Sequence, residues 1–460
     1  MAGGLIQLMA YGSQNQYLMG NPQITFFRMV YRRHTNFSME SIKQYFSNKS
    51  ELTNDGVTKI TCKIDRHGDL VSNIYFSFVL PDIYSDEVYA FKWIKNIGIN
   101  IIREVNISVG GNIIDRQYGE WLHIWNELTL TVDKQDIYNK MTGNTKEYYD
   151  PANANDRIDD YPSQTKDSDI PSIYGRRLYV PLQFWFNRNP GLAIPLIALQ
   201  YHFIEINIEL RSIKELYVLK SNDISQSEYI APDMTMQDQI ISNFIKDGVK
   251  VNEITGLGVF TGFDIAAYLE VNYIFLDNDE RNKFAELSHE YLIEQIYRTE
   301  KIGINGSSGF DLLLQHPVKE LIWVTKRNDL ELRNDWNNYT NLDDNNIQID
   351  TPFKNILLNA KITFNGIDRI ETKDADYFNL IQPYQHHTRG PKEGVYVYSF
   401  SIDPEKYQPS GSCNMSRINN IILYLESIYN DNTEYIATLY AVNYNVFRII
   451  SGMGGLAFST

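Results

Sequence analysis

The sequence contains few side chains whose types and spacing could perform chemistry. His386 and His387 are adjacent, and neighbouring side chains on a strand point to opposite faces, so they could not share a metal ion there without a turn. His289-Glu290 lacks the second histidine that a zinc-protease helix requires four residues on. Gly306-Ser307-Ser308-Gly309 does not match a nucleophile elbow and is better explained as a flexible turn. We therefore predict no catalytic residue, no metal site, no cofactor and no enzymatic activity.

Two further patterns favour structural roles. Asp277-Asn278-Asp279 lacks the glycine and the distal glutamate of a calcium loop. It is better explained as the cap of a short helix, with Glu280 completing a box-like start and Phe284 and Leu287 on one side. The glycine cluster at 256–262 has the wrong spacing for a dinucleotide-binding turn.

Composition and charge narrow the function classes. The chain has 460 residues, 43% of them hydrophobic, and a formal net charge of −15, which is typical of a globular protein of two to four domains. Because nucleic-acid binders are usually basic, direct binding of a genome is not expected. Two cysteines, Cys62 and Cys413, exclude a disulfide framework, and we expect both to be free thiols of a protein made in a reducing compartment.

Period-two alternation of apolar residues predicts mainly strands. It occurs in both halves of the chain, at 60–64, 74–80, 105–109, 204–210, 269–275 and 360–364. Helical spacing is rare, with Trp121, Leu122, Trp125 and Leu128 as the clearest case. Many half-buried strands with a few short inserted helices indicate an all-β sandwich or barrel.

A weak internal repeat divides the chain. The stretch from Glu104 to Arg116 is similar to that from Asn359 to Arg369, and Tyr179-Val180 is later matched by Tyr396-Val397. Because the order is the same, we predict two β-domains of one architecture, at 25–225 and 226–460, preceded by an N-terminal arm at 1–24. Two polar stretches with little periodicity, 133–175 and 327–350, are placed on an outer rim. We expect 133–175 to tolerate insertions better than any other stretch of that length.

Several sequence blocks resemble one known family, the double jelly-roll major capsid proteins of nucleocytoplasmic large DNA viruses, as in phycodnaviruses, iridoviruses and marseilleviruses. The blocks follow the order of the family along nearly the whole chain. They are 3–8, 17–27, 31–37, 276–281, 289–295, 316–321, 376–384 and, most specifically, the run Gln408-Pro409-Ser410-Gly411-Ser412-Cys413-Asn414-Met415-Ser416-Arg417.

This resemblance implies two consecutive eight-stranded antiparallel jelly rolls in one chain. It also implies a structural protein of the virion, made in the host cytoplasm, that forms pseudo-hexagonal homotrimeric capsomers. Those capsomers tile an icosahedral shell around an internal membrane and double-stranded DNA. The implied partners are neighbouring capsomers, minor capsid proteins and penton proteins, with the membrane nearby but not spanned.

Two alternatives use the same kind of sandwich. A receptor- or glycan-binding protein would gather aromatic and Asp or Asn side chains in one concave site, and would not need an uncharged N-terminal arm. A cupin-like metal enzyme would need clustered His and Glu ligands on inward-facing strands, which this sequence lacks.

The N-terminal arm and the cluster that directly follows it carry our candidate partner contacts. The first 27 residues have no ionised side chain, and no acidic residue precedes Glu40. We expect the arm to order against neighbouring capsomers or acidic minor capsid proteins, with the arginines making bidentate contacts. The candidate residues are Tyr17, Phe26, Phe27, Arg28, Tyr31, Arg32 and Arg33. The alternative is an ordinary first strand with internal salt bridges.

Overall fold

The computed structural model describes residues 3–54, 56–86, 88–222, 228–246, 263–342, 354–430 and 433–458. The chain divides into two compact units, Met1–Phe37 and Ser38–Thr460. The glycine cluster at 256–262 and most of the polar run after residue 342 lie outside the described residues. None of the helices in the described ranges has both the length and the apolar character needed to cross a bilayer.

The first unit contains little regular structure. It has two short helices, α1 (Gly3–Met9) and α2 (Gln16–Met19), joined through a 3-10 turn at Ser13–Asn15, and no helical side chain in it is buried. The first strand of the fold starts only at Phe37, which leaves residues 26–33 outside any strand.

The first sandwich consists of two sheets. One has the order β1 (Phe37–Tyr45), β13 (Tyr268–Leu276), β4 (Leu70–Val79), β8 (Arg177–Pro181), with β9 (Ile194–Pro195) beside β4. The other has the order β3 (Thr58–Lys63), β10 (Ile204–Leu210), β6 (Ile102–Val109), β7 (Asn112–Tyr118). Apolar side chains from both sheets, such as Phe76 and Ile206, form one core, as the period-two pattern predicted. Two small sheets pair β11 (Tyr217–Ser221) with β5 (Tyr89–Trp93), and β12 (Phe263–Asp264) with β2 (Glu51–Leu52).

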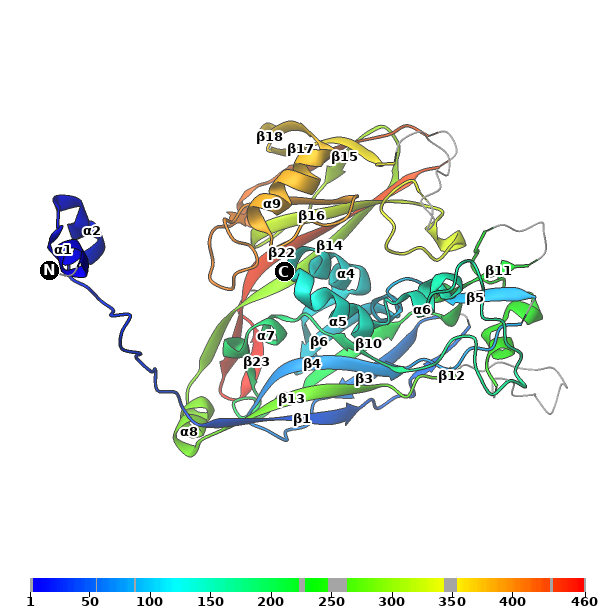
Figure 1. Ribbon diagram of the computed structural model, residues 1–460, viewed down its shortest axis with the longest axis horizontal. Coiled ribbons are helices and arrows are strands. Elements are labelled where there is room, and N and C mark those ends of the chain that lie inside the picture. Colours follow the sequence, from blue (N-terminus) through cyan, green and yellow to red (C-terminus); the bar gives the residue numbers. More distant parts are fainter. Residues whose placement is uncertain are drawn as a thin grey trace. The chain divides into compact units, whose positions relative to one another are not determined.

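The two main sheets of the second sandwich repeat the strand order of the first. One sheet has the order β14 (His289–Ile304), β22 (Tyr435–Ile450), β16 (Pro317–Arg327), β19 (Val395–Ser399), with β20 (Cys413–Asn414) beside β16 and β23 (Met453–Leu456) beside β22. The other has the order β15 (Ser307–Asp311), β21 (Ile421–Ser427), β17 (Leu357–Phe364), β18 (Ile367–Asp374). The internal repeat seen in the sequence is therefore the pair of equivalent hairpins β6–β7 and β17–β18. Figure 1 shows β14, β16 and β22 of the second sandwich above β3, β4 and β13 of the first.

By strand pairing, the first sandwich includes residues beyond position 225. β13 pairs with β4 along Tyr268–Ile274 and holds the place that β22 holds in the second sandwich. The divisions at 24/25 and 225/226 remain a proposal, but by sheet membership the first sandwich runs to Leu276.

Short helices are inserted between the strands. They are α3 (Ile97–Asn100), α4 (Gly119–Thr129), α5 (Val132–Thr142), α6 (Lys146–Tyr149), α7 (Trp185–Arg188), α8 (Asn278–Glu286) and α9 (Gln382–His386). The predicted helices at 121–128 and after Asp277 are α4 and α8, and Asp277 caps α8 by accepting a hydrogen bond from the backbone N–H of Asn278 (2.9 Å). The expected flexible turn at 306–309 is wrong in part, because Ser307 already begins β15.

The core includes one of the two cysteines. Cys62 and Cys413 are both free, as predicted, and Cys62 is buried on β3. Burial raises the pKa of the Cys62 thiol to about 12, and Asp65 adds to this, so the thiol stays protonated and unreactive.

The segment 133–175 is more ordered than its composition suggested. It contains α5 and α6, and the Tyr148 side chain is 1% exposed within the first core. An epitope inserted after Ile158, which is 84% exposed, should therefore leave the folding and the oligomeric state of the protein unchanged. The reason is that doubling the length of a loop costs only about 0.6 kcal/mol. The same epitope after Tyr148 should abolish soluble protein. Size-exclusion chromatography of both variants checks this, and equal tolerance at the two sites would contradict it.

Candidate functional site

The predicted partner-contact residues are all exposed in the first unit. Phe26 is 89% and Phe27 is 99% exposed, and Tyr17 and Tyr31 are exposed as well. The ion pairs between described residues include none from Arg28, Arg32 or Arg33. The role of these seven side chains as partner contacts stays a prediction.

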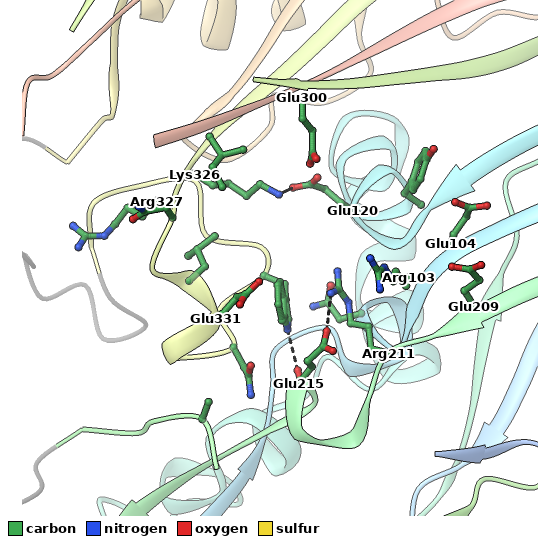
Figure 2. A pocket seen from close by; sticks show the side chains of 18 of the residues that line it. Arg103, Glu104, Glu120, Glu209, Arg211, Glu215, Glu300, Lys326, Arg327 and Glu331 are labelled. Carbon is green, nitrogen blue, oxygen red and sulfur yellow. Dashed lines mark hydrogen bonds and ion pairs between the residues drawn. The ribbon is translucent and has the colours of Figure 1, made fainter. Parts of the chain in front are cut away.

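A second group of charges, which sequence reasoning missed, lies between the two sandwiches. Glu120 on α4 lies 2.7 Å from Lys326 on β16 and accepts a hydrogen bond from the Tyr440 hydroxyl on β22 (2.7 Å). Figure 2 shows Lys326 and Glu120 pointing toward each other across the pocket. Burial alone would raise the pKa of Glu120, but Lys326 and Tyr440 hold it below its usual value. The Glu120 carboxylate therefore stays charged and bonded to two strands of the second sandwich, β16 and β22.

The pocket around this pair has a volume of about 790 Å³. Six carboxylates and six cationic side chains line it, so it favours neither anions nor cations. Many of these charges are paired within the wall, as with Arg211 and Glu215 (3.1 Å; Figure 2). Arg211 also stacks over Trp336, 4.1 Å from the ring centroid, and the Trp336 indole donates to the Glu215 carbonyl (2.9 Å). The pocket is thus a polar seam that joins the sandwiches.

A buried ionic network extends the seam along β14 and β16. Glu294 binds Arg188 of the first sandwich (2.8 Å) and Lys319 of the second (2.6 Å). Lys319 also donates to the Pro404 carbonyl (2.6 Å), and its side chain is 1% exposed. It is the extra residue of a β-bulge, because Val318 pairs with Asn443 and Glu320 with Val442. Lys319 and Glu320 are both buried although they are neighbours in sequence, because β16 is buried on both faces.

His387 completes this network, whereas His386 does not belong to it. The His387 ring lies 3.1 Å from the Glu320 carboxylate and donates to Glu405 (3.0 Å). Burial would lower the pKa of His387, but hydrogen bonds and charges from the two carboxylates raise it to about 9. His386 instead contacts the Ile402 carbonyl (2.8 Å). His387 therefore forms ion pairs with two carboxylates, whereas His386 makes a contact with a loop.

Comparison with known proteins gives the family. Residues 25–277 match the family described as major capsid protein N-terminus, and residues 280–455 match the family described as large eukaryotic DNA virus major capsid protein. The chain belongs to the major capsid proteins of large eukaryotic DNA viruses. The family resemblance drawn from the sequence blocks is thus confirmed.

Individual members of this family are similar to the chain over their full length. The chain is 40% identical to the major capsid protein of Pyramimonas orientalis virus and 38% identical to that of Phaeocystis pouchetii virus, with 100% of each chain covered. A solved structure of the PBCV-1 virus capsid is 30% identical, with a TM-score of 0.68, and the match covers 95% of this chain and 100% of that one. The Faustovirus major capsid protein has the same TM-score at 13% identity, over 97% of this chain and 96% of that one. The fold is therefore the double jelly roll that we predicted.

Residues of the seam lie in the blocks that carry the capsid-protein resemblance. Glu294 belongs to 289–295, and Lys319 and Glu320 belong to 316–321. One signal could have located them: each interrupts an apolar strand with a charge. The burial of these charges could not be predicted from the sequence, because a charged residue on a strand usually marks a solvated face.

Proposed function

We propose that this capsid protein forms homotrimeric capsomers that tile an icosahedral shell around an internal membrane and double-stranded DNA. The observation that carries the proposal is the equivalent strand order of the two sandwiches in one chain. Three chains would present six similar lobes and fill a hexagonal lattice site, and contacts between unlike surfaces would extend the lattice. The implied partners are neighbouring capsomers, minor capsid proteins and penton proteins, in virions assembled in the host cytoplasm.

We propose further that the protein is structural and catalyses no reaction. The relatives are capsid proteins, and the pocket of about 790 Å³ is a seam of balanced, mostly paired charges. Among the described residues there is no group of three or more His, Cys, Asp or Glu side chains placed to hold a metal ion.

The mass of the purified protein tests the homotrimer. Light scattering should give about 160 kDa, three times the 53.4 kDa of one chain. Because obligate interfaces bury more than about 2,000 Å², the melting temperature should rise with protein concentration. A monomer mass together with a melting temperature independent of concentration would contradict the proposal.

The exposed arm supports a role in joining capsomers to their neighbours or to acidic minor capsid proteins. Arg28, Arg32 and Arg33 follow the arm directly, no acidic residue precedes Glu40 in the sequence, and exposed aromatic rings flank the arginines. Arginine forms bidentate pairs with carboxylates, so an acidic partner fits this composition.

Deleting residues 1–24 should leave a soluble trimer with an unchanged melting temperature, because no helical side chain of the arm is buried. Shell formation in infected cells, scored by electron microscopy, should be impaired. Normal particles from the deletion variant would contradict the assembly role. Failure to form trimers would instead place the arm in the trimer contact.

A further inference from the structure

A smaller cavity, which we call the β5 pocket, lies at one end of the first sandwich. Its volume is about 360 Å³, near the lower end of the range of about 300–1,000 Å³ that is typical of small-molecule sites. Three segments far apart in the sequence line it: 84–89, which leads into β5, then 164–166, and 238–244. The last of these includes parts of the 3-10 turns η5 (Gln237–Gln239) and η6 (Ile241–Phe244). In Figure 1 β5 and β11 lie at the opposite end of the sandwich from α8.

Backbone hydrogen bonds tie the three segments of the β5 pocket to one another. The N–H group of Tyr84 donates to the Phe244 carbonyl (2.7 Å), which joins 84–89 to 238–244. The N–H group of Gln164 donates to the Ser85 carbonyl (2.8 Å), which joins 164–166 to 84–89. The walls are therefore held in place within the chain, so a ligand would lose little affinity to the ordering of loops.

The floor of the β5 pocket is aromatic. Phe244 is 4% and Tyr84 6% exposed, and the Phe244 ring packs in the first core, with its centroid 5.3 Å from that of Phe91. Tyr89 is half-buried, and its hydroxyl donates to the Asp238 carboxylate (2.9 Å), which fixes the ring. Because the faces of aromatic rings carry partial negative charge, such a floor attracts the C–H groups of a ligand.

The rim of the pocket carries polar side chains. Asp86, Thr165 and Asp238 are exposed, whereas Gln164 and Asn243 are half-buried. Neither the Gln164 amide nor the Thr165 hydroxyl forms a hydrogen bond with another described residue. Carboxylates only accept hydrogen bonds, whereas amides and hydroxyls both donate and accept them. The rim can therefore bind a ligand whose own groups are both donors and acceptors, as hydroxyls are.

The charges of the pocket favour an uncharged ligand. Two carboxylates and one ammonium group line it, so an anion would meet more negative than positive charge. The ammonium belongs to Lys166 and already donates to the Ser242 carbonyl (2.7 Å). A metal ion is not favoured either, because no group of three or more His, Cys, Asp or Glu is placed to hold one in the described part of the chain. A wholly apolar ligand would leave the polar rim buried without partners.

We propose that the β5 pocket binds a neutral sugar unit of a glycan on the surface of the host cell. A sugar ring has C–H groups on its faces and hydroxyls around its edge, which matches an aromatic floor inside a polar rim. Aromatic and Asp or Asn side chains in one concave site are also what a glycan-binding protein requires, and here they occur in a capsid protein.

The position of the pocket suits a contact outside the shell. The arm, which we place against neighbouring capsomers or minor capsid proteins, leads into β1, and β1 starts at the α8 end of the sandwich. A shell with the arms inward presents the β5 pocket outward. The inference rests on the proposed shell for this orientation only. Many copies on one particle would strengthen an individually weak contact through avidity.

Saturation-transfer difference NMR on the purified protein tests the ligand class. The probes are glucose, galactose, mannose, fucose, xylose and N-acetylglucosamine, with glucuronate and inorganic phosphate as charged comparisons. At least one neutral sugar should bind with a Kd on the order of 1 mM, as expected for a ligand of this size, and both anions should bind more weakly. Absence of binding by every neutral sugar, or tighter binding of an anion, overturns the proposal.

Two variants on different segments test the location. Q164A/T165A should keep the mass and melting temperature of the wild type, because neither side chain is hydrogen-bonded to another described residue. Loss of two hydrogen bonds to the ligand should raise the Kd for the sugar about 10-fold or more. Asp86→Ala, at an exposed site, should raise this Kd as well.

The matched control is S163A/D167N, which changes two polar side chains that flank 164–166 but do not line the pocket. It should leave the Kd for the sugar unchanged. A folded Q164A/T165A or Asp86→Ala variant that binds the sugar as tightly as the wild type overturns the assignment to this pocket.

The outcomes separate this inference from the proposed function. A monomeric mass overturns the homotrimer but leaves the sugar site standing, because the NMR experiment detects binding to a single chain. A wild-type trimer that binds no sugar does the reverse. With whole virions, the free sugar identified by NMR should reduce attachment to host cells, and unchanged attachment at saturating sugar overturns the role of the site on the particle surface.

Discussion

Replacing Glu294 by glutamine should lower the free energy of unfolding by about 3–5 kcal/mol, the cost of removing one partner of a buried ion pair. Glu294 neutralises both Arg188 and Lys319, at 2.8 and 2.6 Å. The amide keeps the size of the side chain but removes its charge. Lys319, with a side chain only 1% exposed, would then be buried without a carboxylate beside it.

Glu290→Gln is the matched control, because Glu290 lies on the same strand. Its ion pair with Arg448 joins side chains that are 57% and 46% exposed, and such surface pairs contribute about 0–1 kcal/mol. Urea unfolding at one protein concentration, compared through the transition midpoint at equal slope, measures both variants. A midpoint shift in Glu294→Gln no larger than in Glu290→Gln would show that the buried ion pairs of Glu294 contribute no more to stability than a surface ion pair does.

Raising the pH from about 6.5 to 10 should remove about 3 kcal/mol of stability through His387 alone. The two carboxylates raise its pKa in the folded protein to about 9, against about 6.5 in an unfolded chain. The folded state therefore holds the proton more tightly. This contribution is fully present below pH 6.5 and is lost as the pH rises through 9. At high pH neutral His387 leaves the Glu320 carboxylate buried without a cation beside it.

His387→Gln should be less stable than the wild type at pH 6 and should lose this part of the pH dependence. His386→Gln is the control, since the His386 ring contacts a backbone carbonyl and forms no ion pair with a carboxylate among the described residues. Urea midpoints measured from pH 6 to 10 provide the comparison. The same slope with pH in the wild type and in His387→Gln would contradict the assignment of this charge.

The alternating strands were predictable because a strand with one buried face shows its burial in its own sequence. β10 alternates between buried and half-buried side chains along its whole length, and the period-two pattern located it. The helix α5 was missed because its composition is polar and only Thr142 in it is buried. Its position depends on the turn at Gly143 (φ 77°) and on the packing that follows.

The sequence by itself determined the two β-domains, their equivalent hairpins and the capsid-protein family, because local alternation, turn residues and ordered motifs are properties of adjacent residues. Tertiary structure alone decided what covers each sheet. β22 is buried on both faces, and its neighbour β16 carries Lys319 and Glu320 into the interior. Whether a charge on a strand is solvated or buried depends on the element that packs over it, and here the partner residues lie 106 and 320 positions away in the chain. The sequence shows which strand residues are charged, but their ion-pair partners are set by the packing of one sandwich on the other.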